Sequence, residues 1–118
     1  MNSEIKSFAD ALNGITYAIR SEKHMKFHLL ATMFVVIAGW FFDITFTEWC
    51  AVILCIGGVI TAEIFNTAIE QLVNLVSPQQ NVIAGRVKDL AAGAVLVFSI
   101  SALVVGLIVF VPKVIALM

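Results

Sequence analysis

The sequence predicts an all-α integral membrane protein, with an N-terminal amphipathic surface helix and three transmembrane helices in a single domain covering 1–118. Hydrophobic residues make up 61% of the 118 residues and charged residues only 13%, whereas soluble domains are about half apolar and about a quarter charged. The hydrophobic residues also gather into three stretches that approach the roughly 20 residues needed to cross a membrane. The net charge of -1, without a basic stripe, excludes a nucleic-acid partner.

The first element is a predicted amphipathic helix over about 4–20. Its apolar side chains recur at spacings of three and four residues, as they do on one face of a helix. These side chains are Ile5, Phe8, Leu12, Ile15 and Ile19. Polar and charged side chains occupy the rest of its circumference, so we expect this helix to lie on the membrane surface.

Three transmembrane helices follow, and their predicted spans are about 24–42, 47–75 and 88–111. The first span carries no charge from 27 to 42, and the short segment 43–48 links it to the second. The second span begins as an apolar run at Trp49 and becomes polar before it ends. A turn-like segment at 76–89 precedes the third span, which Pro112 is expected to close.

The basic residues predict the orientation of the chain, because short loops rich in Lys and Arg stay on the cytoplasmic side. Six of the seven basic residues lie in the N-terminal segment or the second loop: Lys6, Arg20, Lys23, Lys26, Arg86 and Lys88. Only Lys113 lies at the opposite end of the spans. The N-terminus is therefore predicted to be cytoplasmic and the C-terminus external.

A polar stripe on the second span is the strongest sign of chemistry. Glu63 lies roughly 21 Å along the helix from Trp49, within the inner half of a hydrocarbon core about 30 Å thick. Four further polar side chains fall within about 60° of it around the helix; they are Asn66, Thr67, Glu70 and Asn74. Such residues can form hydrogen bonds that hold neighbouring helices together. Two carboxylates at this depth are costly, however, and favour a functional role.

Charged and polar residues from all three spans meet at the cytoplasmic level, and they form the candidate site: Glu22, Glu63, Asn66, Glu70, Lys88 and Asp89. Their oxygens are hard ligands suited to Mg²⁺, and the lysine is suited to phosphate oxygens. The sequence has no glycine-rich phosphate-binding motif, so metal and side chains would have to hold phosphates. His24 and His28 lack a third metal ligand, and we interpret them as interfacial packing residues.

Two motifs carry a family resemblance. The run 63–70, EIFNTAIE, is like the pattern E-x-x-N-S/T-A-I-E, and the run 88–96, KDLAAGAVL, follows at a suitable distance. Weaker support comes from Glu22 followed by His28. On these residues the chain resembles the prokaryotic diacylglycerol kinase and undecaprenol kinase family over essentially its whole length.

This resemblance implies a homotrimer of three-span subunits, with active sites built between protomers. It implies that Glu63 is the general base for a lipid hydroxyl and that Asn66 is a positioning group beside it. The implied ligands of magnesium and nucleotide are Glu22 and Glu70. Further implied ATP contacts come from the surface helix, the second loop and the start of the third span: Lys6, Asp10, Gln79, Gln80, Asn81, Lys88 and Asp89. The implied lipid-binding positions are Glu63, Asn66 and Ala92.

The implied activity is that of an ATP- and Mg²⁺-dependent lipid kinase of the bacterial inner membrane, which phosphorylates the hydroxyl of a lipid alcohol at the cytoplasmic interface. The run after Lys88 looks more like the undecaprenol branch than the diacylglycerol branch, so undecaprenol is the favoured substrate. Four positions depart from the family pattern and bear on nucleotide binding more than on the class of reaction: His24, Lys26, Asn74 and Asn81.

A second hypothesis comes from a different class of protein. In a small oligomeric membrane transporter or channel, Glu63 and Glu70 would bind protons or cations along a pathway. The polar stripe extends only from mid-span towards the cytoplasm, and the outer half, 49–60, is apolar. The sequence therefore shows no continuous polar path across the membrane.

Overall fold

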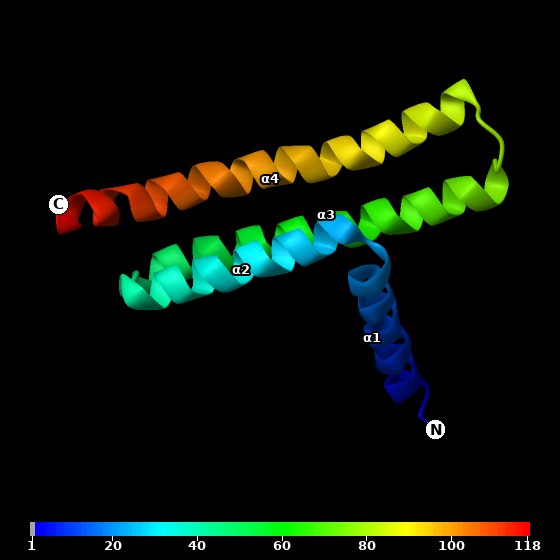
Figure 1. Ribbon diagram of the computed structural model, residues 1–118. Coiled ribbons are helices and arrows are strands. Elements are labelled where there is room, and N and C mark those ends of the chain that lie inside the picture. The colour runs from blue at the N-terminus through cyan, green and yellow to red at the C-terminus, as the bar shows by residue number, and fades with distance from the viewer. Residues whose placement is uncertain (1) are drawn as a thin grey trace.

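The computed structural model describes residues 2–118, so the predicted domain, 1–118, begins one residue outside this range. Four helices follow one another along the described chain: α1 (Ser3–Ser21), α2 (Lys23–Phe41), α3 (Phe46–Val76) and α4 (Val82–Leu117). The last three are each long and apolar enough to cross a membrane, which confirms the all-helical, three-span prediction. Helices α2 and α4 both run along α3, whereas α1 leaves them at a steep angle (Figure 1).

Glu22 separates α1 from α2 and marks the bend between them. Its backbone is extended, with φ of -105° and ψ of 117°, so one helix cannot continue through it. Its side chain accepts a hydrogen bond from the His24 backbone amide at 3.4 Å and caps the start of α2. Ala18 and Met25, on either side of the bend, are both buried. Since α1 contacts α2 and α3, the bend is held by packing within the chain.

Helix α1 presents an exposed apolar face. Ile5, Phe8 and Leu12 each have more than half of their surface exposed. The helix agrees in extent with the predicted range 4–20. Its position on the membrane surface stays a prediction, and the exposed apolar side chains are the groups that would enter the bilayer.

Residues 42–45 form a tight link between α2 and α3. Asp43 has a φ of 51°, in the left-handed region that aspartate tolerates better than most residues. Thr45 and Glu48 then form a capping box. The Glu48 amide donates to Thr45 Oγ1 at 3.2 Å, and the Thr45 amide donates to Glu48 Oε1 at 2.9 Å. These bonds fix the first turn of α3 and turn the chain back along α2.

Glycine lets the helices approach closely at two points. Gly39 in α2 lies against the ring of Trp49 in α3, where an added Cβ would be 2.8 Å from the ring carbon Cη2. Gly58 in α3 lies against the ring of Phe98 in α4, which an added Cβ would overlap. Each contact sets the spacing of α3 from one neighbour.

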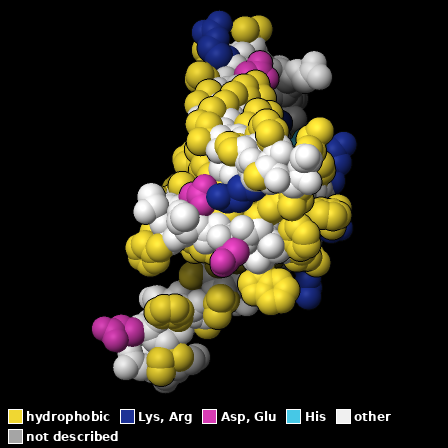
Figure 2. All heavy atoms as spheres, turned by 90° about the vertical axis from the view of Figure 1, so that its left-hand side faces the viewer, with side chains coloured by type: hydrophobic (Ala, Val, Ile, Leu, Met, Phe, Trp, Pro, Cys, Tyr) yellow, Lys and Arg dark blue, Asp and Glu magenta, His cyan; other side chains and the backbone are white. Residues whose placement is uncertain are grey.

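A small buried core lies at the end of the bundle that contains the α2–α3 link. Ile44, Val52 and Val109 cluster there, and Lys113 Nζ lies 3.1 Å from Glu48 Oε1, which ties the end of α4 to the start of α3. Figure 2 looks onto this end and shows hydrophobic side chains over most of the surface, with Lys, Arg, Asp and Glu side chains scattered among them.

Helix α4 begins earlier than the start predicted for the third span, at 88. Asn81 Oδ1 accepts hydrogen bonds from the backbone amides two and three residues on, at 2.8 and 3.2 Å, and so caps a helix that starts at Val82. The turn predicted over 76–89 is consequently limited to 77–81. The charged residues that suggested a loop lie instead on the first two turns of α4.

Helix α4 does not end at Pro112 but continues through it to Leu117, while the end of the third membrane span at this proline stays a prediction. Proline lacks an amide hydrogen and so removes one hydrogen bond of the helix. Here it lies within two turns of the C-terminal end, where few further bonds depend on it.

Candidate active site

Glu63, near the middle of α3, is a buried carboxylate with 2% of its surface exposed. Its Oε1 lies 3.1 Å from Nε2 of His28 on α2. One turn further along α3, the Thr67 hydroxyl donates to the Glu63 carbonyl oxygen at 3.0 Å. Burying a carboxylate is costly unless it is hydrogen-bonded, and His28 supplies that bond from a neighbouring helix.

Asn66 continues the buried part of the stripe, and its Nδ2 donates to Glu70 Oε1 at 3.2 Å. Two oxygens here, Glu63 Oε2 and Asn66 Oδ1, are buried and have no hydrogen-bond partner among residues 2–118. Buried polar atoms in folded proteins are nearly always paired. These two acceptor oxygens are therefore the atoms of the site best suited to receive a hydrogen bond from a ligand.

The predicted stripe runs from these buried positions to the exposed Asn74. Lys88 of α4 joins it there, because its Nζ donates to Asn74 Oδ1 at 2.7 Å. Asp89 and Ala92 follow at exposed positions of α4. One end of the α3–α4 pair thus presents a cation beside the last polar residue of the stripe.

The loop after α3 and the adjoining helix ends enclose an open hollow of about 580 Å³. Gln79, Gln80 and Asn81 line it together with Asn74 and Lys88. The structure thus brings the predicted loop residues and the predicted phosphate-binding lysine onto one surface. Asn81 Oδ1 is already engaged in capping α4.

The candidate residues of α1 lie elsewhere. Lys6 Nζ and Asp10 Oδ2 form an exposed ion pair at 2.9 Å. Figure 1 shows α1 well away from the loop between α3 and α4. A single subunit therefore does not bring this pair together with Lys88.

The carboxylates of the candidate site do not form a ready-made metal centre. Among residues 2–118, no group of three or more His, Cys, Asp or Glu side chains is placed to hold a metal ion. Glu22 caps α2, and Glu70 accepts from Asn66. Magnesium at phosphate-transfer sites is commonly held by one or two carboxylates together with phosphate oxygens and waters. The hard oxygens of Glu22 and Glu70 fit that donor set, and their role as metal ligands stays a prediction.

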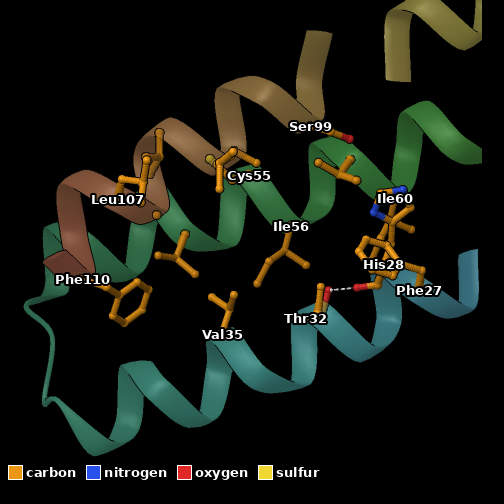
Figure 3. A pocket seen from close by; sticks show the side chains of 17 residues that line it. Phe27, His28, Thr32, Val35, Cys55, Ile56, Ile60, Ser99, Leu107 and Phe110 are labelled. Atoms are coloured by element: carbon orange, nitrogen blue, oxygen red, sulfur yellow. Dashed lines mark hydrogen bonds between the residues drawn. The ribbon is translucent and has the colours of Figure 1, made fainter. Parts of the chain in front are cut away.

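An apolar cavity of about 470 Å³ lies between α2, α3 and α4. In Figure 3 it extends from Phe110 at one end to Phe27 and His28 at the other, with side chains of all three helices around it. The backbones of α2 and α4 do not approach each other closely, so the cavity opens between them. Because His28 lines the cavity and contacts Glu63, the cavity adjoins the buried carboxylate.

The structure corrects the interpretation of His28 as an interfacial packing residue, since its imidazole pairs with Glu63. The sequence offered one indication of this pair: the predicted topology places His28 just inside the cytoplasmic start of the first span and Glu63 in the cytoplasmic half of the second. Depth does not predict which way α2 is rotated, so it could not link the two residues.

The fold and the site together define a class, that of helical membrane proteins with a buried polar site beside an apolar cavity between spans. Comparison with known proteins identifies the family. The family described as prokaryotic diacylglycerol kinase matches residues 9–110. The chain belongs to this family and is a lipid kinase.

Two relatives extend this assignment. The chain is 39% identical over 113 residues to the undecaprenol kinase of Bacillus subtilis, covering 96% of this chain and 92% of that protein. It is 31% identical over 113 residues to a diacylglycerol kinase of Synechocystis, covering 95% of this chain and 65% of that protein. The resemblance stated from the motifs is confirmed, and the family favours the kinase over the transporter or channel.

Proposed function

We propose that this lipid kinase transfers the γ-phosphoryl group of ATP, with Mg²⁺, to the hydroxyl of a membrane lipid alcohol, and that it prefers undecaprenol to diacylglycerol. The reaction takes place at the cytoplasmic interface of the bacterial inner membrane. The observation that carries the proposal is the buried Glu63 carboxylate, whose Oε2 has no partner among residues 2–118, beside an apolar cavity. The higher identity to the Bacillus undecaprenol kinase, 39% against 31%, supports the choice of lipid.

Glu63 acts in this proposal as the general base for the lipid hydroxyl. Its Oε2 accepts the hydroxyl proton while the hydroxyl oxygen forms a bond to the γ-phosphorus of ATP. The bond from that phosphorus to the ADP oxygen breaks, and ADP leaves. Asn66, held by its hydrogen bond to Glu70, presents its own unpartnered oxygen beside the base and helps to position the substrate.

The negative charge of the phosphates is offset by cations at the cytoplasmic end of the site. Glu22 and Glu70 are the residues that would hold magnesium, and the ion would supply positive charge near the transferring group. Lys88 contributes a second positive charge. Its partner in the structure is the neutral amide of Asn74, which leaves the lysine charge uncancelled and available for a phosphate.

The apolar cavity is the proposed place of the lipid tail near the reacting hydroxyl. Its volume of about 470 Å³ lies in the range typical of ligand pockets, roughly 300–1,000 Å³. Its lining is almost wholly apolar, and it opens between α2 and α4, where a lipid could enter sideways from the bilayer. At its Glu63 end it contains the polar groups of His28 and Thr32, so the head of the lipid belongs at that end.

A homotrimer completes the nucleotide site in this proposal. Lys6 and Asp10 lie on α1, away from the hollow that contains Lys88. Large apolar side chains are also exposed on each span, among them Phe34, Leu54 and Ile108. Such side chains must be covered by lipid or by other helices. Association of subunits would cover part of this surface and bring the α1 pair of one copy towards the α3–α4 end of another.

The proposal is tested by the transfer of labelled γ-phosphate from magnesium ATP to undecaprenol and to diacylglycerol in separate detergent micelles. We expect faster transfer to undecaprenol. Glu63→Gln should lower the rate by roughly 10²–10⁴-fold, the usual contribution of a general base.

The matched control is Glu48→Gln, the same change in another carboxylate of α3. Glu48 lies at the far end of the helix, and glutamine can keep its place in the capping box. We expect this variant to retain the wild-type rate. A normal rate in Glu63→Gln would remove Glu63 from the role of base, and a preference for diacylglycerol would overturn only the choice of lipid.

A further inference from the structure

The contact between His28 and Glu63 joins two helices at the centre of the site. Nε2 of the imidazole lies 3.1 Å from Oε1 of the carboxylate, and the two side chains are only 16% and 2% exposed. The proposed role of Glu63 as a base requires an ionised carboxylate, which has no proton to donate. In that role the proton of this contact belongs to Nε2 of His28, which donates to Oε1.

The ring of Phe27 contacts the imidazole of His28. The two rings meet edge-on, with centroids 5.6 Å apart and an interplanar angle of 75°. The Thr32 hydroxyl donates to the backbone carbonyl oxygen of His28 at 2.8 Å, the bond drawn in Figure 3. On α2, Phe27 is thus the side chain that packs against the imidazole that reaches Glu63.

The two carboxylate oxygens of Glu63 therefore differ in their hydrogen bonding. Oε1 is tied to α2 through His28, and Oε2 is buried without a partner among residues 2–118. A carboxylate with one tied oxygen cannot rotate freely, so the other oxygen keeps a fixed direction. No other side-chain hydrogen bond to either carboxylate oxygen of Glu63 occurs in the described part of the chain.

We propose that His28 is a positioning residue, which holds Glu63 so that Oε2 faces the hydroxyl of the lipid substrate. This inference rests on the proposed function. His28 takes no proton in the reaction: the hydroxyl proton passes to Oε2, and Nε2–H continues to donate to Oε1 throughout. Loss of this bond would let the base leave its reactive position, and a misplacement of about 1 Å can cost about 10²-fold in rate.

The test compares two substitutions at this position by measuring kcat and the KM values for lipid and ATP. His28→Leu removes the donor, and we expect kcat to fall by about 10–10²-fold while both KM values change little. His28→Gln keeps an N–H donor on a side chain of similar reach, and we expect it to recover most of the lost rate. A side chain that acts only in packing would give no such recovery.

A double-mutant cycle with Glu63→Gln isolates the pair. In the Glu63→Gln background, His28→Leu should cause no further loss of kcat, since there is no base left to position. Equal losses in both backgrounds, or a normal kcat in His28→Leu, would overturn the positioning role while the kinase activity stands. Absence of transfer by the wild-type protein to either lipid would instead overturn the proposed function, and the positioning role with it.

The contact can also be observed without turnover. The chain contains only two histidines, so ¹⁵N NMR of the labelled protein can resolve the His28 imidazole. We expect protonated Nε2 in the wild type and a change in this signal in Glu63→Gln. A signal that is unchanged by Glu63→Gln would show that the two side chains do not interact, and would overturn the inference whatever the activity.

Discussion

Glu63 and Glu70 carry the same side chain in different surroundings. Glu63 is buried and has an imidazole from another helix as its donor. Glu70 is half-buried nearer the end of α3 and accepts from the amide of Asn66. Two carboxylates in unlike environments can take separate roles in one reaction. The more enclosed one suits proton transfer, and the more accessible one suits a hydrated cation.

Glu70→Gln tests this division of roles. Replacing a charged ligand by a neutral one should raise the Mg²⁺ concentration needed for the half-maximal rate by about tenfold or more. The glutamine oxygen can still accept from Asn66, so the local structure should persist. The measurement is a magnesium titration of the initial rate, with Glu48→Gln as control. An unchanged magnesium dependence would exclude Glu70 as a metal ligand.

The sequence predicted which residues belong to the candidate site, but not all of the side chains that they contact. The positions of Glu63 and Asn66 on one buried stripe follow from the geometry of a single helix. The contacts of His28 with Glu63 and of Lys88 with Asn74 join different helices. They depend on how those helices are rotated and how deep they lie, and neither quantity follows from the spacing of residues along one helix.

Among the helices, α3 is the central one, since it contacts each of the other three. In its packing against α4, Gly58 lies directly against the ring of Phe98. The neighbouring Gly57 has no atom within 4 Å of the position of an added Cβ. Substitutions at these adjacent glycines can therefore distinguish the effect of close packing on stability from the effect of helix propensity.

We expect Gly58→Ala to lower the free energy of unfolding by about 1–3 kcal/mol, the usual cost of overpacking. Gly57→Ala should leave it unchanged or raise it by up to about 1 kcal/mol, because alanine favours the helix. The measurement is thermal unfolding in detergent, followed by the loss of helical circular dichroism. Similar changes in the two variants would contradict the close contact with Phe98.

The number and type of elements were predictable, because each span is a long apolar run and α1 has a clear helical period. The ends of α4 were not. Asn81 acts as a cap through hydrogen bonds that depend on its conformation, and Pro112 is tolerated because it lies near the end of the helix. Composition alone predicted a turn around Asn81 and the end of the span at Pro112.

The whole subunit is thin, with extents of 55 × 43 × 20 Å, and much of its apolar surface is exposed. Asn74 lies 11 residues beyond Glu63, or roughly 16 Å along α3. Lys88, which contacts Asn74, is therefore far from the proposed base, Glu63, within one chain. This distance would not matter in a site to which one copy of the chain contributes Glu63 and another copy contributes Lys88.

Mixed trimers test the sharing of sites. Co-expression of Glu63→Gln with Lys88→Met should restore transfer, because about one third of the shared sites in trimers that contain both variants receive both intact residues. Each variant alone should be nearly inactive. The measurement is the initial rate of purified mixed oligomers, selected through a different tag on each variant. If the mixture is no more active than its parts, the base and the lysine belong to the same subunit.

Helices α2 and α4 pack on α3 but not closely on each other, so the cavity is open along the gap between α2 and α4. Where no neighbouring subunit closes that gap, acyl chains of the bilayer must do so. If the lipid enters through this gap, as proposed, it must displace those chains, and tightly packed chains resist displacement more than fluid ones. We therefore expect the rate of phosphorylation to rise with the fluidity of the bilayer that supplies the substrate.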